Sequence, residues 1–171
     1  MKITVWPDNN LYFHYGIDVF IENHKKSVKK YPWLVFIDLS GYNLKDILRG
    51  NFFDFSSKGA TIVFICEEKL LPLGLYYKEI IKKSYLFSAR ENTEYIVQKI
   101  GSRDYDHMVN PFRVLSGDEY LLLRMMFIEH KSIKLIASEL GVSNKTVYSR
   151  AESISKKIQI KNIKYLCIRD S

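Results

Sequence analysis

The sequence predicts two domains of different class, an α/β domain over residues 1–103 and an all-α domain over residues 112–171. Three observations favour this division. Short runs rich in β-branched and aromatic residues alternate with longer helical patterns up to about residue 100, which is typical of a parallel α/β sheet. Beyond residue 112 every segment has a helical pattern. Between the two, residues 104–111 form a polar stretch that ends in Asn110-Pro111 and is predicted to be a linker.

The first domain is expected to contain strands at residues 3–6, 33–37, 61–66 and 85–88, because these are its short apolar runs. Helices are predicted at residues 76–83 and 92–100, and their outer faces are candidates for pairing with a second copy of the chain or with another protein.

The second domain begins with a helix over about residues 117–129. Ser116-Gly117-Asp118-Glu119 reads as a capping box, in which the Ser116 hydroxyl and the Glu119 carboxylate satisfy free backbone N–H groups. Ser132 is predicted to cap the next helix, whose apolar stripe consists of Ile133, Ile136, Ala137 and Leu140. Gly141 can then adopt the left-handed conformation that ends this helix.

Ser143 is predicted to cap a third helix, so two short helices meet through a tight turn, which is the pattern of a helix-turn-helix. The apolar residues of the third helix share one face and are expected to point inward: Val147, Ala151, Ile154 and Ile158. The opposite face is polar: Asn144, Lys145, Tyr148, Ser149, Glu152, Ser153 and Lys156. Such a face either enters the major groove of DNA or is simply the solvated side of a small bundle.

The motifs from Leu115 through Asn162 resemble the LuxR-type (NarL/FixJ) DNA-binding domain, and the likeness covers about the last 57 residues. The matching elements are Leu115-Ser116-x-x-Glu119, the run from Ser132 to Val147, and Ile154-x-x-Lys157-Ile158-x-Ile160-x-Asn162. The sequence departs from the family's usual pattern at Leu135, at Gln159 and at Arg150-Ala151, so a known operator cannot be transferred to it.

The resemblance implies a bacterial, cytoplasmic transcription regulator with a four-helix domain whose fourth helix, about residues 163–169, pairs with a second protomer. Double-stranded DNA is then the partner, bound by a homodimer or by a heterodimer with a related regulator. Lys145, Thr146 and Lys157 are implied to hold phosphates, whereas Tyr148, Ser149 and Glu152 face base edges. Glu152 is equally compatible with an exposed charge that reads nothing. The full set of candidate DNA-binding residues is Ser143, Asn144, Lys145, Thr146, Tyr148, Ser149, Arg150, Glu152, Ser153, Lys156 and Lys157.

Regulators with this kind of DNA-binding domain often begin with a receiver domain, and the first domain looks like a degenerate, shortened (flavodoxin-like) receiver. Asp38 aligns with the phosphoacceptor, but its expected partners are poor: Asn9 replaces one acid of the metal-binding pair, Cys66 follows the third strand without a hydroxyl, and Ser88 stands where Lys is expected. About thirty residues separate Asp8 from Asp38, which leaves scarcely any room for a second strand and helix. Asp38 is therefore expected to be a strand-end residue or a helix cap rather than a phosphorylated group.

Two further patterns in the first domain allow two interpretations each. An aromatic group either lines a small-molecule pocket or, as is more common, belongs to the core: Tyr12, Phe13, Tyr15, Phe52, Phe53, Phe55, Tyr76 and Tyr77. The basic run at residues 25–30 is either a membrane or nucleic-acid patch or the solvated face of a helix, of which the second is more common.

Charge and composition narrow the function classes. Residues 112–171 carry 11 Lys and Arg against 6 Asp and Glu, so this domain holds most of the net charge of +7, as a nucleic-acid-binding unit would. No phosphate-binding loop, nucleophile elbow, metal-ligand spacing or membrane-length apolar run is found. No catalytic residue, metal or cofactor is predicted. The alternative function is that of a modulator that heterodimerises with another regulator and binds DNA weakly or not alone.

Overall fold

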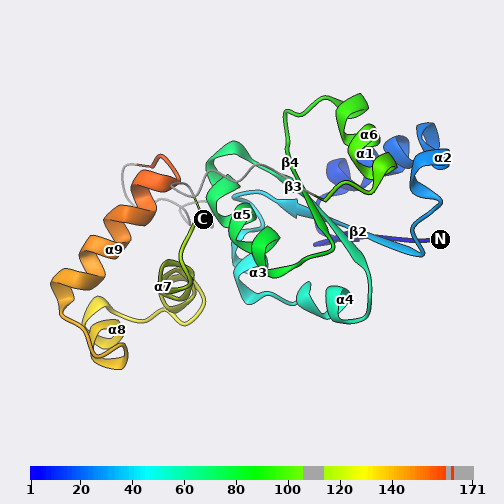
Figure 1. Ribbon diagram of the computed structural model, residues 1–171. Helices are drawn as coiled ribbons and strands as arrows, with labels where there is room; N and C mark the ends of the chain where they lie inside the picture. Colours follow the sequence, from blue (N-terminus) through cyan, green and yellow to red (C-terminus); the bar gives the residue numbers. More distant parts are fainter. Residues whose placement is uncertain (106–113, 161–162, 164–171) are drawn as a thin grey trace.

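The first domain is built around a parallel β-sheet with helices on both faces (Figure 1). The structure, a computed structural model, describes residues 1–105, 114–160 and 163. Its strands are β1 (Lys2–Trp6), β2 (Trp33–Leu39), β3 (Thr61–Cys66) and β4 (Ser84–Ser88), and they pair in the order β1-β2-β3-β4. The predicted α/β class and the positions of the strands are confirmed, although β2 continues beyond the predicted residue 37.

The chain between β1 and β2 forms only helices, α1 (Leu11–Asn23) and the short α2 (Lys25–Val28). β1 therefore pairs directly with β2, with Lys2 opposite Trp33 and Trp6 opposite Ile37. The prediction that this segment has no room for a second strand is confirmed. As a result β1 is an outer strand of the sheet formed by the described residues.

Each face of the sheet packs on its own set of helices, because alternate residues of a strand point to opposite faces. On one face Leu34, Phe36, Val63, Tyr85 and Phe87 pack with α1, α2 and α6 (Thr93–Ser102). On the other face Val35, Ile37, Ile62, Phe64 and Leu86 share a cluster with α3 (Leu44–Arg49), α5 (Leu71–Ile80) and, at its margin, α4 (Phe53–Ser57). A single 3-10 turn, η1 (Glu68–Leu70), precedes α5.

The second domain contains α7 (Gly117–Phe127), α8 (Ile133–Glu139) and α9 (Asn144–Lys157) among its described residues. The capping box is confirmed, since Ser116 Oγ accepts from Glu119 N at 3.2 Å and Ser116 N donates to Glu119 Oε2 at 2.7 Å. α7 ends at Phe127, slightly before the predicted residue 129. Most of the predicted linker, and the predicted fourth helix apart from Ile163, lie outside the described residues.

The two domains meet where α7 packs against α3 and α5. The ring of Tyr120 on α7 stacks on Tyr76 with 4.5 Å between centroids and meets Tyr77 edge-on at 5.6 Å. Leu115 N donates to Pro72 O at 3.2 Å. One hydrophobic cluster consequently extends from the sheet into the second domain. The sequence suggested the 76–83 helix as a surface for another chain, but the side of α5 that carries Tyr76 and Tyr77 is covered by α7.

Candidate nucleic-acid interface

The turn between α8 and α9 fixes the direction of α9. Gly141 follows α8 with φ +64°, a left-handed conformation that costs glycine little. Ser143 then caps α9, because its Oγ accepts from Thr146 N at 3.1 Å and lies 2.9 Å from Thr146 Oγ1. The predicted helix-turn-helix geometry is thus present, with Ser143 and Thr146 occupied in starting the helix.

The inward face of α9 is as the spacing predicts. Val147, Ala151, Ile154 and Ile158 are all buried, with exposures between 0 and 8%. They pack against Ile136 and Ala137 of α8 and against the apolar side of α7. Burial of these four side chains holds α9 in place and leaves the rest of its surface free to carry polar groups.

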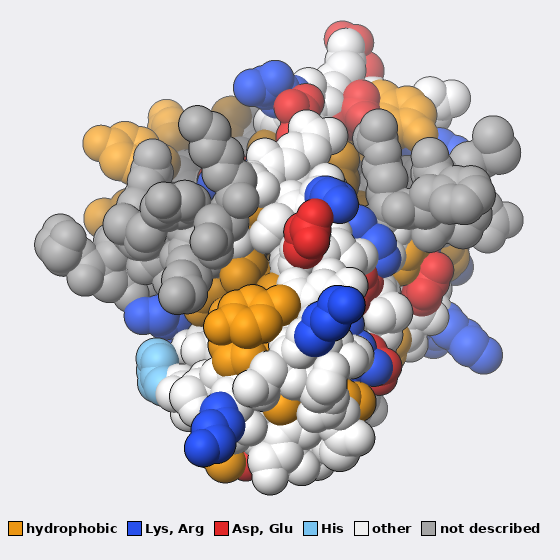
Figure 2. Space-filling view, turned by 90° about the vertical axis from the view of Figure 1, so that its left-hand side faces the viewer, with side chains coloured by type: hydrophobic (Ala, Val, Ile, Leu, Met, Phe, Trp, Pro, Cys, Tyr) orange, Lys and Arg blue, Asp and Glu red, His pale blue; other side chains and the backbone are white. Residues whose placement is uncertain are grey.

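The outward face of α9 is open to solvent. Tyr148 is 62% exposed, and the other residues of this face that are exposed are Asn144, Lys145, Ser149, Glu152 and Lys156. Glu152 and Lys156 pair across one helical turn, with 2.8 Å between Oε1 and Nζ. The hydrogen bond from Lys156 lowers the pKa of Glu152. Figure 2 looks at this side of the molecule and shows Lys and Arg side chains lying among uncharged polar ones.

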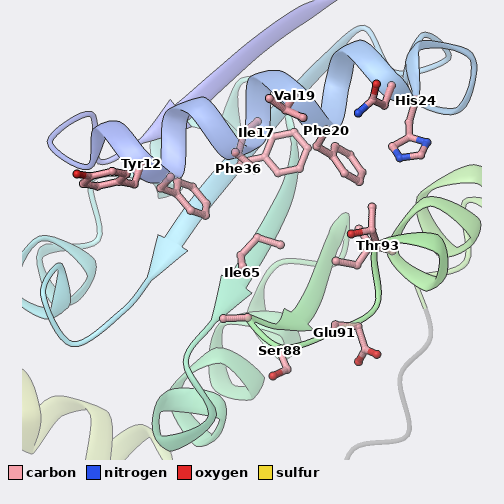
Figure 3. A pocket seen from close by; sticks show the side chains of 15 residues that line it. Tyr12, Ile17, Val19, Phe20, His24, Phe36, Ile65, Ser88, Glu91 and Thr93 are labelled. Atoms are coloured by element: carbon pink, nitrogen blue, oxygen red, sulfur yellow. The ribbon is translucent and has the colours of Figure 1, made fainter.

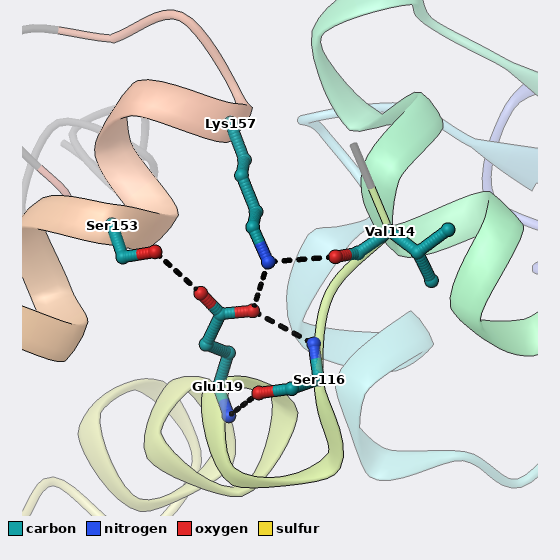
Figure 4. A network of polar contacts seen from close by, with 5 residues as sticks. All are labelled: Val114, Ser116, Glu119, Ser153 and Lys157. Atoms are coloured by element: carbon teal, nitrogen blue, oxygen red, sulfur yellow. Dashed lines mark hydrogen bonds and ion pairs between the residues drawn. The ribbon is translucent and has the colours of Figure 1, made fainter. Parts of the chain in front are cut away.

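Three candidate residues of α9 instead turn towards the beginning of α7. Arg150 Nη2 lies 2.8 Å from Asp118 Oδ2. Ser153 Oγ donates to Glu119 Oε1 at 2.7 Å. Lys157 Nζ donates to Glu119 Oε2 and to Val114 O, both at 2.7 Å (Figure 4). The sequence assigned all three to the DNA surface, whereas the structure gives each a partner within the domain.

Glu119 is the centre of this network and is only 6% exposed. Burial by itself raises the pKa of a carboxyl, but hydrogen bonds from Lys157, Ser116 N and Ser153 outweigh it and hold the pKa of Glu119 below its usual range. A buried carboxylate with this many donors ties α9, α7 and Val114 together. Its local role as a capping residue was visible in the sequence, but its contacts to α9 were not.

The degenerate phosphoacceptor position is buried. Asp38 lies in β2, next to its last residue, and is 6% exposed. Its Oδ2 accepts from Asn10 Nδ2 and Asn43 Nδ2, each at 2.8 Å. Burial raises the pKa of Asp38 although these amides partly oppose the shift. The expectation of a strand-end residue or a helix cap is met by the strand end, since the helix that follows β2, α3, has Asn43 as its N-cap.

The side chains that donate to the Asp38 carboxylate are the uncharged amides of Asn10 and Asn43, and they do not supply the charges that phosphoryl transfer uses. Among the described residues, no group of three His, Cys, Asp or Glu side chains could hold a metal ion. Cys66 ends β3 and is buried, and burial raises the pKa of its thiol far above its usual range. Ser88 ends β4, where a receiver-like site would need a cation.

The aromatic group of the first domain divides between core and surface. Phe52 and Tyr77 are fully buried, and Phe53, Phe55 and Tyr76 pack against them, so the core interpretation holds for these five. Tyr12 and Tyr15 are 92% and 72% exposed and belong to no core. Tyr12 and Phe13 do line a groove of about 430 Å³ between α1 and the chain from Ser88 to Ile96 (Figure 3).

The basic run at residues 25–30 lies on and after α2, and within it Lys25, Lys26 and Lys29 are exposed. Within the part of the chain that the structure describes, no helix is long and apolar enough to cross a membrane.

Comparison with solved structures agrees with this architecture. The two-component response regulator RcsB, in a complex with DNA, matches over 98% of this chain and 96% of its own, with 16% identity and a TM-score of 0.51. An RcsB structure with two dimers bound to two parallel DNAs matches with 18% identity, coverages of 98% and 96% and a TM-score of 0.44. Full-length FixJ from B. japonicum matches with 14% identity, coverages of 97% and 93% and a TM-score of 0.40. The first match shows the fold, and the other two add no argument.

No curated protein is significantly similar to the chain in sequence. The family model of the EcpR N-terminal domain, however, matches residues 1–102, which is more than half of the chain and coincides with the α/β domain. The chain therefore belongs to the EcpR N-terminal domain family, and its fold is similar to that of the two-component response regulator RcsB.

Proposed function

We propose that this protein is a transcription regulator that binds duplex DNA as a dimer through α9 and does so without metal-dependent phosphorylation of Asp38. The observation that carries the proposal is the open polar face of α9, which projects from a well-packed helix-turn-helix. A helix held in this way fits the major groove, with its first residues nearest the base edges.

The roles of the candidate residues divide according to their contacts. Lys145 at the beginning of α9 and Lys156 near its end are exposed and lie at suitable places to hold the phosphate backbone. Tyr148, Ser149 and Glu152, on the same face between them, are the candidates for contact with base edges. Arg150, Ser153 and Lys157 hold α9 on α7 through Asp118 and Glu119, so we assign them a positioning role.

Independence from phosphorylation is supported by both domains. Asp38 is buried beneath the side chains of two asparagines and is not surrounded by metal-binding carboxylates among the described residues. In addition, the outward face of α9 is exposed while α7 is docked on the first domain. No release of the second domain is then required before α9 reaches DNA.

Two features support the proposal of a dimer, the family resemblance of the sequence and an exposed apolar stretch on α1. Leu11, Tyr12, Tyr15 and Val19 are all exposed on this helix, which is unusual for large apolar side chains that lie so close together. A dimer would present two α9 helices to half-sites about 10 bp apart, within an imperfect inverted repeat. The same exposed stretch favours the alternative function, a modulator that binds another regulator.

A DNA-binding measurement with the purified chain separates the two functions. For a regulator that binds DNA itself, an electrophoretic shift is expected with protein alone, and Lys145→Ala weakens binding to all sequences alike. Its salt dependence should flatten by about 0.9 in the slope of log K against log [salt], the contribution of one phosphate. A shift that appears only when a second regulator is added would favour the modulator, and an unchanged Lys145→Ala variant would remove α9 as the reading helix.

A further inference from the structure

The fold gathers basic side chains that are far apart in the sequence at one end of the first domain. All strands are parallel and begin in register across the sheet, with Lys2 opposite Trp33, Leu34 opposite Thr61 and Ile62 opposite Ser84. The residues that precede or begin the strands therefore lie at one end of the sheet, the end formed by the amino termini of the strands. The carboxyl ends of α2 and α6 lie at the same end. We call it the basic end: Lys2, Lys25, Lys26, Lys29, Lys30, Lys58, Lys82, Lys83, Lys99 and Arg103.

Backbone contacts tie these segments into one surface. Lys2 N donates to Pro32 O at 2.9 Å, which joins the beginning of β1 to the chain that enters β2. Ile62 N donates to Lys83 O at 3.1 Å and joins the beginnings of β3 and β4. Arg103 Nη2 donates to Lys30 O at 2.7 Å and adds the end of α6. Four strands about 4.8 Å apart give this end a width of roughly 14 Å, before α2 and α6 are added.

Most of this charge is not neutralised within the described residues. The acidic residues at this end are Glu22, Asp54, Glu79 and Asp104. Glu22 pairs with Lys25 at 2.9 Å, and Asp104 pairs with Lys99. Five exposed lysines make no ion pair with any residue that the structure describes: Lys26, Lys29, Lys58, Lys82 and Lys83. Residues 1–103 carry 15 Lys and Arg against 11 Asp and Glu. Because ten of the basic residues belong to the basic end, acidic residues outnumber basic ones in the rest of this domain.

The acidic residues are concentrated at the opposite end of the sheet, where the strands have their carboxyl termini. Asp8, Glu67, Glu68 and Glu91 lie after the carboxyl ends of the strands, where the two exposed cations, Lys69 and Arg90, pair with Glu67 and Glu68. The domain is therefore polarised along its strands. Helix carbonyl ends at the basic end attract lysines only weakly, by a few tenths of a kcal/mol to about 1 kcal/mol at an exposed site. Lys58 is the C-cap of α4, and Lys82 and Lys83 directly follow the C-cap of α5, so this weak attraction acts on them too, but it is too small to require so many lysines at one end.

We infer that the basic end is a second nucleic-acid contact surface, which binds the sugar–phosphate backbone without sequence preference. Phosphates of a duplex offer closely spaced negative charges over the whole width of this end, and lysine binds them as a point charge without strict geometry. Lysines of this set lie on separate loops at one end of a rigid sheet. This fixed arrangement suits the regularly spaced phosphates of a duplex. Among the described residues beside them, the exposed large apolar side chains are Met1 and Ile80, which are too few to form a broad apolar patch for insertion into a lipid surface.

The position of the basic end distinguishes it from α9. In Figure 1, α2 and α6 lie at the opposite side of the molecule from α8 and α9. One straight duplex seated on α9 would not reach the basic end of the same chain. The two surfaces are thus suited to two separate segments of nucleic acid, which one protein molecule could hold together.

The test uses the full chain and a 30-bp duplex of random sequence, with affinity measured at several salt concentrations. Lys82→Gln/Lys83→Gln removes two unpaired charges from the basic end, and Lys69→Gln/Arg90→Gln removes two charges from the opposite end as a matched control. The first variant should lower the salt slope by about 0.9 for each lost phosphate contact, and the control should leave it nearly unchanged. Because all four side chains are exposed, thermal unfolding should confirm that both variants remain folded.

The outcomes separate this inference from the proposed function. If Lys82→Gln/Lys83→Gln and the control give the same slope, the basic end is not a nucleic-acid surface and the inference is wrong. If the slope is unchanged but the wild type sediments with vesicles containing 30% phosphatidylserine and the variant does not, a lipid surface replaces it. If Lys145→Ala leaves the salt slope unchanged while Lys82→Gln/Lys83→Gln lowers it, the proposed role of α9 is wrong and the inference about the basic end is supported.

Discussion

Lys157 Nζ lies 2.7 Å from Glu119 Oε2 and joins the last turn of α9 to the first turn of α7. Both groups are largely withdrawn from water, since the side chain of Lys157 is 22% exposed and that of Glu119 is 8% exposed. An ion pair in this setting is worth far more to the fold when intact than when one partner is missing, because the remaining charge is buried without compensation.

Replacement of Lys157 should therefore lower the stability of the protein more than replacement of Lys156. We expect Lys157→Ala to lower the free energy of unfolding by about 2–3 kcal/mol, somewhat less than for a fully buried pair. Lys156→Ala removes only the exposed pair with Glu152 and should cost about 0–1 kcal/mol. Chemical denaturation measures both. Equal losses for the two variants would contradict the positioning role of Lys157, as would a Lys157→Ala protein that keeps its stability but loses salt-dependent DNA binding.

The lowered pKa of Glu119 predicts a definite response to acid. A carboxyl whose pKa is lower in the folded state stabilises the protein above its unfolded pKa, and this contribution is lost as the pH falls through the folded pKa. Wild-type stability should thus decline below about pH 4.5, the ordinary value for Glu. Glu119→Gln should be less stable at pH 7 but show a flatter decline in the acid range. Parallel pH profiles of the two proteins would mean that Glu119 is not responsible.

Asp38 should behave in the opposite way. Its pKa is raised, so the ionised form is disfavoured in the folded state, and stability increases as the pH falls through the folded pKa. Asp38→Asn should raise the melting temperature at pH 7, and the advantage should shrink towards acid pH. The amide oxygen can still accept from Asn10 and Asn43.

The same variant tests phosphorylation. Incubation of wild type with a small phosphodonor and Mg²⁺ should leave the intact mass unchanged, and Asp38→Asn should bind DNA like the wild type. A mass increase in the wild type that is absent from Asp38→Asn would identify Asp38 as a phosphoacceptor after all.

Tyr120 should control the docking of the two domains. Tyr120→Ala removes the stack on Tyr76 and the edge contact with Tyr77, and we expect a loss of about 2–3 kcal/mol, since each aromatic pair contributes about 0.5–1.5 kcal/mol beyond its area. Tyr120→Phe keeps the rings and gives up the long, 3.5 Å hydrogen bond to Leu48 O and the interaction of the hydroxyl with Tyr77. Limited proteolysis of the segment before α7 should accelerate in Tyr120→Ala alone. An equal effect of both variants would place the contribution in the hydroxyl.

Glu152 should influence which base pair is preferred rather than overall affinity. A carboxylate in the major groove accepts from the amino group of cytosine, and loss of one specific contact costs about 1–3 kcal/mol of discrimination. Selection of binding sites from a random library should show relaxed preference at one position for Glu152→Ala. The pair with Lys156 offers the competing explanation, so an unaltered selection profile would leave Glu152 as the partner of Lys156 only.

Local patterns explain what the sequence predicted well. The inward face of α9 follows from helical spacing, and the caps at Ser116, Ser132 and Ser143 follow from side chains acting within three residues. Three strands of the first domain, β2, β3 and β4, are almost wholly buried apolar runs, whereas β1 is only half-buried. The sequence also indicated correctly that a second strand is missing, because the number of residues before Asp38 limits what can be built.

The sequence could not predict contacts between residues that are far apart along the chain. Lys157 and Glu119 are 38 positions apart, and no pattern in either segment marks them as a pair. Exposure of Tyr12 and Tyr15 depends on how α1 is rotated over the sheet, since both are as apolar as the residues that it buries. Likewise, Lys58 and Lys83 come to the same end of the sheet only because β3 and β4 are parallel and pair with each other.

Among the strands that the structure describes, β1 is an outer strand, and one side of its backbone has no neighbouring strand. Unpaired strand edges of this kind commonly pair with a strand of another molecule. This strand is only five residues long, begins with a lysine and is followed at once by Pro7. Each of these properties discourages a further strand from adding. The short length and the charge of this outer strand therefore oppose pairing with a strand of another copy, and a longer outer strand would favour such pairing.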